Sequence, residues 1–474
     1  MVWLEDGALG YPPISAAPYN PSESYPEYNG PLGKTPNPVY AAVRRALANL
    51  NLDAKRLGRP DWNPIGELVP PGSRIVIKPN WVLHANEGPG GTDCLITHAS
   101  ILRAVIDYAL RARPAMLVVG DAPVQVCRFD ALLGLGFERV AEWYRTQGVP
   151  IEVKDFRRTI TVRGSHSVRV QTRLRPMEEY RLVDLGAESL LEPISADFSK
   201  FRVTMYNPDD LPVAHAPGRH RYLIARDVLE ADLVINVPKV KTHMKAGVTL
   251  ALKNLVGING SKEFLPHHRK GAADSGGDNY ERRTLPKALL EDVLDWMNRH
   301  ALDKPNLYGV MNRIAYKILW FDRIRGLPAN VEGGWHGNDT VWRMCLDLNT
   351  ILLYADREGR LREMPQRVTL HVGDGIIAGE GDGPLRPDPV PFGLVTAALN
   401  AAAHDWAVTT AMGLDPRRIP IICRAFDTRP HPLAGFGPAD IEVVTDGVAP
   451  PRALRPASGW RGHCESVPEE RCRA

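Results

Sequence analysis

The chain of 474 residues is long enough for two or three structural units, or for one unit with large insertions. Hydrophobic residues make up 44% and charged residues 24% of it, which is typical of a folded globular protein and excludes a disordered or fibrous one. The formal net charge of +3 is small for this length, so neither nucleic acid nor an anionic membrane is expected as a partner. No apolar run approaches the roughly 20 residues of a membrane helix, and the N-terminal sequence has no signal-peptide pattern.

The six cysteines are scattered along the chain, and none belongs to a Cys-x-x-Cys pair. This spacing argues against a disulfide framework and against a four-cysteine metal cluster, and it favours reduced thiols. Because signal and membrane segments are also not seen, the sequence predicts a cytoplasmic protein.

The first 149 residues indicate an irregular arm followed by a βαβ pattern. Residues 1–38 are rich in Pro, Tyr, Gly and Ser, and proline at this density resists both helix and sheet. Strand, helix and strand with short connections then predict a parallel sheet covered by helices. The expected elements are a helix over 39–52, a strand over 75–77, a helix over 101–110 with Thr97 as its N-cap, and a strand over 116–120.

Residues 150–225 differ from the rest, because they carry many charges and no clear helical stripe. They contain the alternation "ITVRGSHSVRVQTRL", which predicts a hairpin. The α/β pattern resumes after them. Its expected elements are a strand within 231–241, helices over 246–258 and 285–300, a strand and loop over 367–384, a helix over 393–413 and a strand over 441–444.

These elements predict an α/β fold, with a mostly parallel sheet covered by helices and an inserted β-rich subdomain. The expected divisions are an N-terminal arm with the first helix (1–69), a first α/β half (70–149), an insertion or small β-rich subdomain (150–225), a second α/β half (226–449) and a loosely ordered tail (450–474).

Polar and charged residues follow four of the predicted strands. Ligands of open parallel sheets bind at the carboxyl ends of the strands, so we expect these residues to share one edge. Polar residues also begin ordinary loops, which is the alternative for each of them alone. The residues are Asn80, Asp121, Lys239, Lys241, His243 and Asp374.

The stretch "PKVKTHMKAGVTLALKNLVG", residues 238–257, holds the densest group of basic residues in the chain. We predict a helix beginning near Ala246 and Gly247, whose free amides and nearby lysines would bind phosphate or carboxylate. On that helix Thr249 and Lys253 would share a face, and a lysine in an apolar helix is usually paired or shifted in pKa for chemistry. A solvated basic loop is the alternative interpretation.

Two further basic stretches accompany it. In "SKEFLPHHRKG" adjacent histidines point to opposite sides, so one of His267 and His268 is expected to face the site and the other to be structural. The stretch "GGWHGNDTVWR" combines flexible glycines with His336 and Arg343.

An acidic, glycine-rich stretch, "GDGIIAGEGDGP", carries Asp374, Glu380 and Asp382. Spaced carboxylates on such a loop suit Mg²⁺ or another hard cation. They also fit a plain acidic turn, and the register of a calcium-binding loop is missing.

Several of these segments resemble the DUF-362 family, a domain of unknown function. The likeness spans roughly residues 70 to 400 and is carried by "IVIKPNWV", "VVGDAP", "VINVPKVKTHMKAGVTLALKNLVGING", "FLPHHRKG", "GGWHGNDTVWRMCLDLN" and "DGIIAGEGDGPLRP". Some members of that family carry an iron–sulfur module whose Cys-x-x-Cys repeats this sequence lacks, so no iron–sulfur cluster is expected.

A second, local segment resembles the nickel-dependent lactate racemase family, in which His-x-x-Ala-Gly-x-Ser precedes a lysine that carries a nickel pincer nucleotide. Here His243, Ala246, Gly247 and Thr249 precede Lys253 at the same offset. The resemblance implies Lys253 as cofactor anchor and His243 as metal ligand or proton-transfer group. The racemase phosphate motif Asp-x-Thr-Arg-Pro is replaced by "KPNWV" after the first strand.

Together these patterns favour an enzyme that acts on a small anionic metabolite, with racemase or isomerase chemistry preferred. The catalytic residues would be His243, Lys253 and Asp121. The ligand or cofactor would contact Asn80, Lys239, Lys241, Gly247, Thr249, His267, His336 and Arg343, and a divalent metal such as Mg or Ni would bind Asp374, Glu380 and Asp382. The alternatives are Mg-dependent phosphoryl transfer or ligation, and a non-catalytic metabolite or cofactor carrier.

Overall fold

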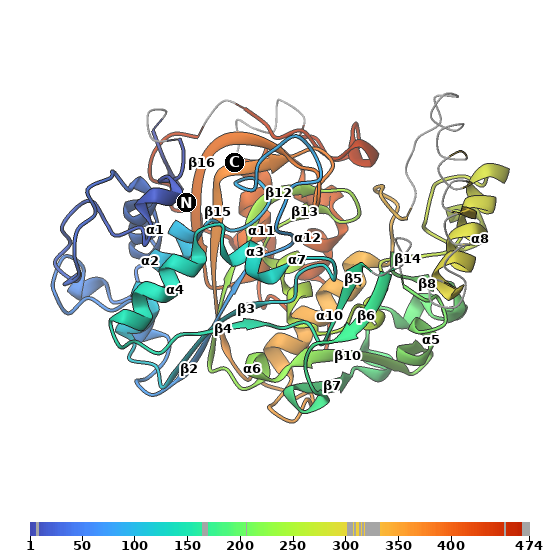
Figure 1. Ribbon diagram of the computed structural model, residues 1–474, viewed down its shortest axis with the longest axis horizontal. Coiled ribbons are helices and arrows are strands. Elements are labelled where there is room, and N and C mark those ends of the chain that lie inside the picture. The colour runs from blue at the N-terminus through green and yellow to red at the C-terminus, as the bar shows by residue number, and fades with distance from the viewer. Residues whose placement is uncertain are drawn as a thin grey trace.

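The computed structural model describes residues 1–5, 9–163, 169–204, 206–300, 307, 310, 311, 314, 317, 332–449 and 452–466. Mixed α/β architecture is observed, with a large, mostly parallel central sheet between two layers of helices (Figure 1). The predicted fold class is therefore confirmed. Among the described helices, none is long and apolar enough to cross a membrane.

The central sheet has nine strands, and its main path has the order β1-β16-β15-β11-β2-β3-β4. From β15 to the edge strand β4, neighbouring strands run parallel. The outer strands β16 and β1 are antiparallel to their neighbours. The strands are β1 (Val2–Trp3), β2 (Arg74–Pro79), β3 (Met116–Asp121), β4 (Glu152–Asp155), β11 (Leu233–Val237), β15 (Val368–Glu380) and β16 (Asp388–Ala398).

Apolar side chains on both faces of the sheet make two separate cores, because neighbouring residues of a strand point to opposite faces. In β2, Ile75 and Ile77 join one core and Val76 joins the other. Figure 1 places α1, α2 and α4 on one side of the sheet and α7, α10, α11 and α12 on the other. These helices are α1 (Pro38–Ala48), α2 (Ala99–Arg111), α4 (Phe137–Thr146), α7 (Ala251–Asn254), α10 (Val341–Tyr354), α11 (Ala401–Ala411) and α12 (Pro420–Cys423).

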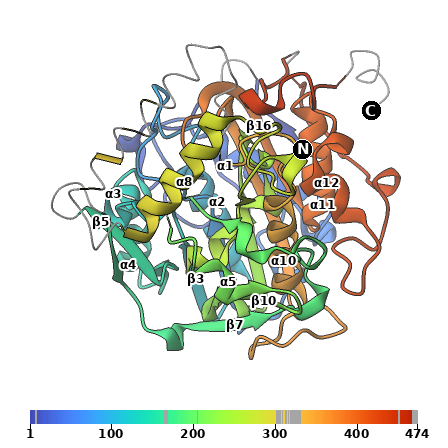
Figure 2. The same cartoon turned by 90° about the vertical axis from the view of Figure 1, so that its right-hand side faces the viewer.

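Residues 152–225 contain β4, the edge strand of the central sheet, and smaller antiparallel sheets, of which β7 and β10 lie at the bottom of the view in Figure 2. The predicted hairpin is confirmed as β5 (Thr159–Arg163) and β6 (Arg169–Arg173). The remaining elements here and nearby are β7 (Tyr180–Asp184), β9 (His215–Ala216), β10 (Arg219–Ala225), the pair β8 (Phe201–Arg202) and β14 (His268–Arg269), and the helices α3 (Phe129–Leu133), α5 (Leu211–Ala214), α6 (Arg226–Leu229) and α8 (Leu285–His300).

The basic stretch after β11 folds differently from its prediction. Instead of entering a helix at Gly247, the chain forms a hairpin of β12 (Lys239–His243) and β13 (Gly247–Thr249). Gly247 has φ +82°, a left-handed conformation that stops a helix from starting there. Helix α7 begins only at Ala251, where the Asp405 carboxylate accepts hydrogen bonds from the first two amides. The prediction that a helix begins near Gly247 and offers free N-terminal amides there is therefore wrong.

Three further predictions of local structure are also wrong. His98 rather than Thr97 caps α2. Residues 393–398 belong to β16, because Asn400 caps the following helix and delays its start to Ala401. The apolar residues 441–444 form no strand, and Val443 and Val444 are exposed.

The last described segment, residues 452–466, is packed rather than loose. Trp460 and Cys464 are buried in the core, and the Trp460 indole donates to the Met244 carbonyl. Cys94, Cys127, Cys345, Cys423 and Cys464 are free thiols. Cys472, the sixth cysteine, lies outside the described residues.

Candidate functional site

A buried ion pair joins the ends of the first two parallel strands. Lys78, in β2, lies 2.8 Å from the Asp121 carboxylate at the end of β3, and it also donates to Asn254 Oδ1 at 3.0 Å. Asp121 accepts from the backbone amides of Trp81 and Ala122 as well. Burial raises the pKa of Asp121 and lowers that of Lys78, and the charge of each opposes the shift of the other.

The close approach of this pair to the segment after α7 requires a glycine. A Cβ atom on Gly257 would lie 1.8 Å from the Asp121 carboxylate and 2.7 Å from the Lys78 ammonium. Asn80 completes the group, because its Nδ2 donates to Asn254 Oδ1 at 2.8 Å while its own Oδ1 is buried without a partner among the described residues. The carboxyl ends of β2 and β3 therefore meet the segment after the basic hairpin.

Strand β12 presents its basic residues on one face, because residues two apart along a strand point the same way. The repeat of Lys239, Lys241 and His243 has this spacing. Lys241 is fully buried, and its ammonium donates to the Leu95 carbonyl at 2.6 Å. Burial lowers the pKa of Lys241 well below its usual range, and the charges of Lys239 and Lys253 lower it further.

The His243 ring is fixed by the turn that follows it. Its Nδ1 accepts the backbone amides of Lys245 at 3.0 Å and Ala246 at 3.2 Å. Because amides can only donate, Nδ1 carries the lone pair and the neutral ring carries its hydrogen on Nε2. Burial and the charge of Lys253 lower the pKa of His243 well below its usual range, so the ring is neutral near pH 7.

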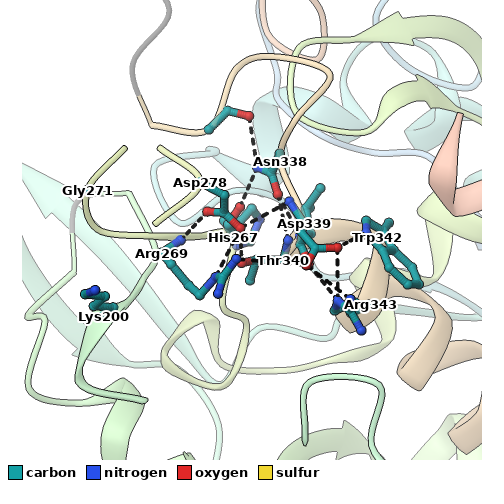
Figure 3. A network of polar contacts seen from close by, with 12 residues as sticks. Lys200, His267, Arg269, Gly271, Asp278, Asn338, Asp339, Thr340, Trp342 and Arg343 are labelled. Atoms are coloured by element: carbon teal, nitrogen blue, oxygen red, sulfur yellow. Dashed lines mark hydrogen bonds and ion pairs between the residues drawn. The ribbon is translucent and has the colours of Figure 1, made fainter. Parts of the chain in front are cut away.

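The opposite tautomer is found at His267, which lies before β14. Its Nδ1 lies 2.7 Å from the Leu265 carbonyl and must donate to it, which leaves the lone pair on Nε2. Figure 3 shows Asn338 holding the same segment, and its Nδ2 donates to the His267 carbonyl at 2.9 Å. The pKa of His267 is also lowered by burial and by neighbouring lysines.

Five lysines and these two histidines form what we call the cationic cluster: Lys78, Lys241, Lys245, Lys253, Lys262, His243 and His267. Lys253 acts on every other member of the cluster. Burial lowers the pKa values of the four lysines besides Lys253 and of both histidines, and the charge of Lys253 lowers each of these pKa values further. The pKa of Lys262 falls to about 8.

The cluster has few compensating carboxylates. Of its five lysines, only Lys78 forms an ion pair with a carboxylate in the described part of the chain. Lys245 donates to the Thr204 hydroxyl at 3.0 Å. Lys253 and Lys262 are half-buried, and their ammonium groups have no hydrogen-bond or ion-pair partner among the described residues. Nearby, Thr249 Oγ1 is buried without a partner, again within the described residues.

Thr249 does not share a helix face with Lys253 as the sequence predicted, because it belongs to β13 and α7 starts after it. Gly247 lies in the hairpin, against Ile419 and Trp460.

A second lysine network lies beside the cluster. Lys239 is fully buried, 3.2 Å from the Asp374 carboxylate and 2.6 Å from the hydroxyl of Tyr11. Tyr11 comes from the N-terminal arm, stacks on His98 and also bonds Asp374. Lys239 is thus neutralised inside the protein, and it has less charge to offer a ligand than Lys253.

Two predicted ligand contacts lie at the periphery. His336 stacks on His463 with ring centroids 4.1 Å apart and contacts the Gly459 carbonyl. Arg343 pairs with Asp339 at 3.1 Å, as Figure 3 shows, and donates to the Leu190 carbonyl. Both side chains are held by protein groups, and no contact joins them to the described lysines of the cluster.

The three carboxylates of the predicted metal loop do not converge. Asp374 and Glu380 lie in the same strand, β15, rather than in a loop. Asp374 binds Lys239, Glu380 binds Arg452 and Arg455, and Asp382 accepts the Ser458 amide. The described ranges contain no group of three or more His, Cys, Asp or Glu side chains that could hold a metal ion.

Sequence reasoning did not assign Lys78, Asn254 or Tyr11. Lys78 could have been identified from the sequence, since it is a charged residue in an apolar strand, directly before Pro79. Asn254 and Tyr11 could not, because their importance depends on partners far away in the sequence.

Residues 181–410 match the model of the family described as "Domain of unknown function (DUF362)", which confirms the predicted resemblance over that range. A thylakoid-associated protein of Synechocystis sp. is 23% identical over 358 residues, covering 75% of this chain and 68% of that protein. A Thermotoga maritima protein of known crystal structure is 11% identical, with a TM-score of 0.32, and the match covers 76% of this chain and 55% of that one.

Proposed function

We propose that this protein is an enzyme that binds a small anionic metabolite, carboxylate or phosphate, at the cationic cluster and transfers a proton on it. The observation that carries the proposal is the charge imbalance: Lys253 and Lys262 stand unpaired, among the described residues, beside three more lysines. Buried or half-buried cations are normally paired, because leaving them alone costs free energy. An anionic ligand would supply the missing charge.

Ligand binding would also restore the acid–base strength of the histidines. Their pKa values are lowered by burial and by the charges of neighbouring lysines. An anion beside Lys253 offsets those charges, so the pKa of His267 would rise toward neutrality once the substrate is bound. The base would thus become effective only with its substrate in place.

The tautomers give the two histidines different roles. His267 offers a lone pair on Nε2, so it would accept a proton, while His243 offers Nε2–H and would donate one. A racemase or isomerase needs one group that accepts a proton from the substrate and another that donates a proton to it. Lys253 would hold the substrate's charge or act as electrophile, and Asp121 would keep Lys78 in position.

A nickel pincer cofactor fits this site only in part. Lys253 is half-buried and unpaired among the described residues, as an anchor should be. His243 does not fit a metal ligand, because its Nδ1 accepts two amide hydrogens and its Nε2 therefore carries a hydrogen. We therefore derive no catalytic step through nickel.

The second candidate is a carrier that binds the same anion without turnover, since the charge imbalance alone would serve it equally. Phosphoryl transfer with Mg²⁺ has less support, because its three predicted carboxylates bind protein groups.

Binding and turnover can be tested separately. Titration calorimetry with pyrophosphate as probe should show binding that Lys253→Met weakens at least about tenfold, whereas the exposed Lys55→Met variant should bind normally. Hydroxy acids and sugar phosphates incubated with the protein in D₂O should then exchange a carbon-bound proton, detected by NMR. Loss of exchange in His267→Gln with binding retained supports the enzyme; binding without any exchange supports the carrier; no binding removes both.

We also propose a cytoplasmic location, supported by the free thiols of the described cysteines. The name of the Synechocystis relative associates that protein with thylakoids. Cell fractionation with detection of this chain in the membrane pellet would contradict the proposal.

A further inference from the structure

A cavity of about 420 Å³ lies between the sheet and the helices α7, α10 and α11. This volume falls within the range of small-molecule sites, about 300–1,000 Å³. Its wall is mainly apolar and includes Leu252, Leu255, Leu352, Leu353, Leu399 and Leu433. Three polar residues spaced two apart also line it: Arg367, directly before β15, and Thr369 and His371 at the beginning of that strand.

A chain of hydrogen bonds fixes the tautomer of His371. The Lys78 ammonium can only donate, so Asn254 accepts through Oδ1 and donates through Nδ2 to Asn236 Oδ1, at 2.7 Å. Asn236 Nδ2 then donates to the Ala251 carbonyl at 2.9 Å and to His371 Nδ1 at 3.2 Å. The carbonyl, which can only accept, fixes Asn236 in the same orientation independently.

His371 therefore carries its hydrogen on Nε2. The residue is 1% exposed, and this Nε2–H has no hydrogen-bond partner in the described part of the chain. A buried donor without a partner is destabilising relative to a satisfied one, so a ligand acceptor placed there would be favoured. Burial lowers the pKa of His371 to about 3, which keeps the ring neutral.

Arg367 is the second unsatisfied group in the same wall. It is 6% exposed, and its terminal nitrogens donate to the backbone carbonyls of Leu229, Leu352 and Ala355. Within the described part of the chain, the Arg367 Nε–H has no hydrogen-bond partner and no carboxylate forms an ion pair with the guanidinium. The cavity thus joins an apolar wall to two unused donors, one of them on a cation.

We propose that this cavity binds a small amphipathic carboxylate, whose apolar body packs against the leucines and whose oxygen accepts from His371 Nε2–H. The positive charge of Arg367 in the same wall favours an anionic ligand over a neutral or cationic one. The inference does not depend on the activity of the cationic cluster, because none of the residues that line this cavity belongs to that cluster.

Octanoate is a suitable probe, and octylamine, with the same chain and the opposite charge, is its control. Titration calorimetry should show octanoate binding and much weaker octylamine binding. His371→Phe keeps an aromatic ring but removes the donor, and it should weaken octanoate binding about tenfold. With ¹⁵N-labelled histidine, octanoate should also shift the His371 Nε2 resonance.

Leu399 lines the cavity and is 44% exposed, so it can be changed without disturbing the core. Leu399→Glu should weaken octanoate binding about fivefold by charge repulsion and strengthen any octylamine binding by charge attraction, whereas Leu399→Gln should change little. These variants decide the question if His371→Phe does not fold. The proposal is overturned if octanoate fails to bind, if octylamine binds equally well, or if Leu399→Glu and Leu399→Gln bind octanoate alike.

Discussion

Lys239 and Lys253 lie in the same basic stretch of sequence, yet the fold treats them in opposite ways. Lys239 is fully buried between the Asp374 carboxylate and the Tyr11 hydroxyl. Lys253 is half-buried, and among the described residues nothing pairs with it. The first lysine has an internal counter-charge, and the second needs an external one.

This difference separates stability from binding. Removing a charge from a paired, buried site leaves its partner uncompensated, which destabilises the fold. Removing a charge from an unpaired cluster relieves repulsion, and its cost should appear only when the ligand is added. Each variant below tests one side of that division.

The largest effect is expected at the paired lysine. Asp374→Asn leaves Lys239 buried without its carboxylate and should lower the free energy of unfolding by about 3–5 kcal/mol. Urea unfolding measures this loss. The matched control is Asp382→Asn, which should cost about 1 kcal/mol, because within the described residues the Asp382 carboxylate accepts only the Ser458 amide. Equal losses in the two variants would mean that the Lys239–Asp374 pair adds no special stability.

Lys253→Met should show the reverse pattern. The variant keeps the aliphatic stem and removes one charge from a cluster of like charges, so its melting temperature should stay within a few degrees of the unmodified protein. The pKa values of His243 and His267 should rise, because Lys253 lowers both. NMR titration of the histidines measures the rise. A variant that unfolds would instead place Lys253 in a structural role.

Unpaired cations also make stability depend on pH. The pKa of Lys262 is about 8 in the folded protein and its ordinary value is 10.5, so between these values the folded chain binds fewer protons than the unfolded one. The free energy of unfolding should therefore gain a contribution as pH rises through that window, and lose it as pH falls through about 8.

Lys262→Met should remove this part of the pH dependence, and saturating pyrophosphate should reduce it by raising the pKa of Lys262. Urea unfolding at several pH values, with and without pyrophosphate, measures both effects. A pH dependence that neither change alters would show that Lys262 does not stand in an uncompensated cationic environment.

The sequence was sufficient for four of the parallel strands, but not for β16, which was predicted as helix, nor for the pairing of the lysines. Long apolar runs predicted β2, β3, β11 and β15, because strands buried on both faces have that composition. The pairing of Lys239 depends on Tyr11, which is 228 residues away in the sequence. A local sequence pattern cannot predict a contact between residues so far apart. The prediction of a helix from Gly247 was wrong because this residue has a left-handed conformation within the hairpin, where Trp460 packs against it.

The smallest effect on stability and on ligand binding is expected for substitution of Arg343, which lies outside the cationic cluster. It forms an ion pair with Asp339 at the N-terminal end of α10, where both side chains are partly exposed, and solvent-screened pairs contribute about 0.2–1 kcal/mol. Arg343→Gln should therefore lower the free energy of unfolding by no more than about 1 kcal/mol. Because its guanidinium already binds Asp339 and the Leu190 carbonyl, pyrophosphate affinity should also stay within about twofold. Calorimetry on this variant and on Lys253→Met compares a paired with an unpaired cation directly. A tenfold loss at Arg343 would place it in contact with the ligand, as its sequence alone predicted, and would mean that pairing within the protein does not exclude a cation from the site.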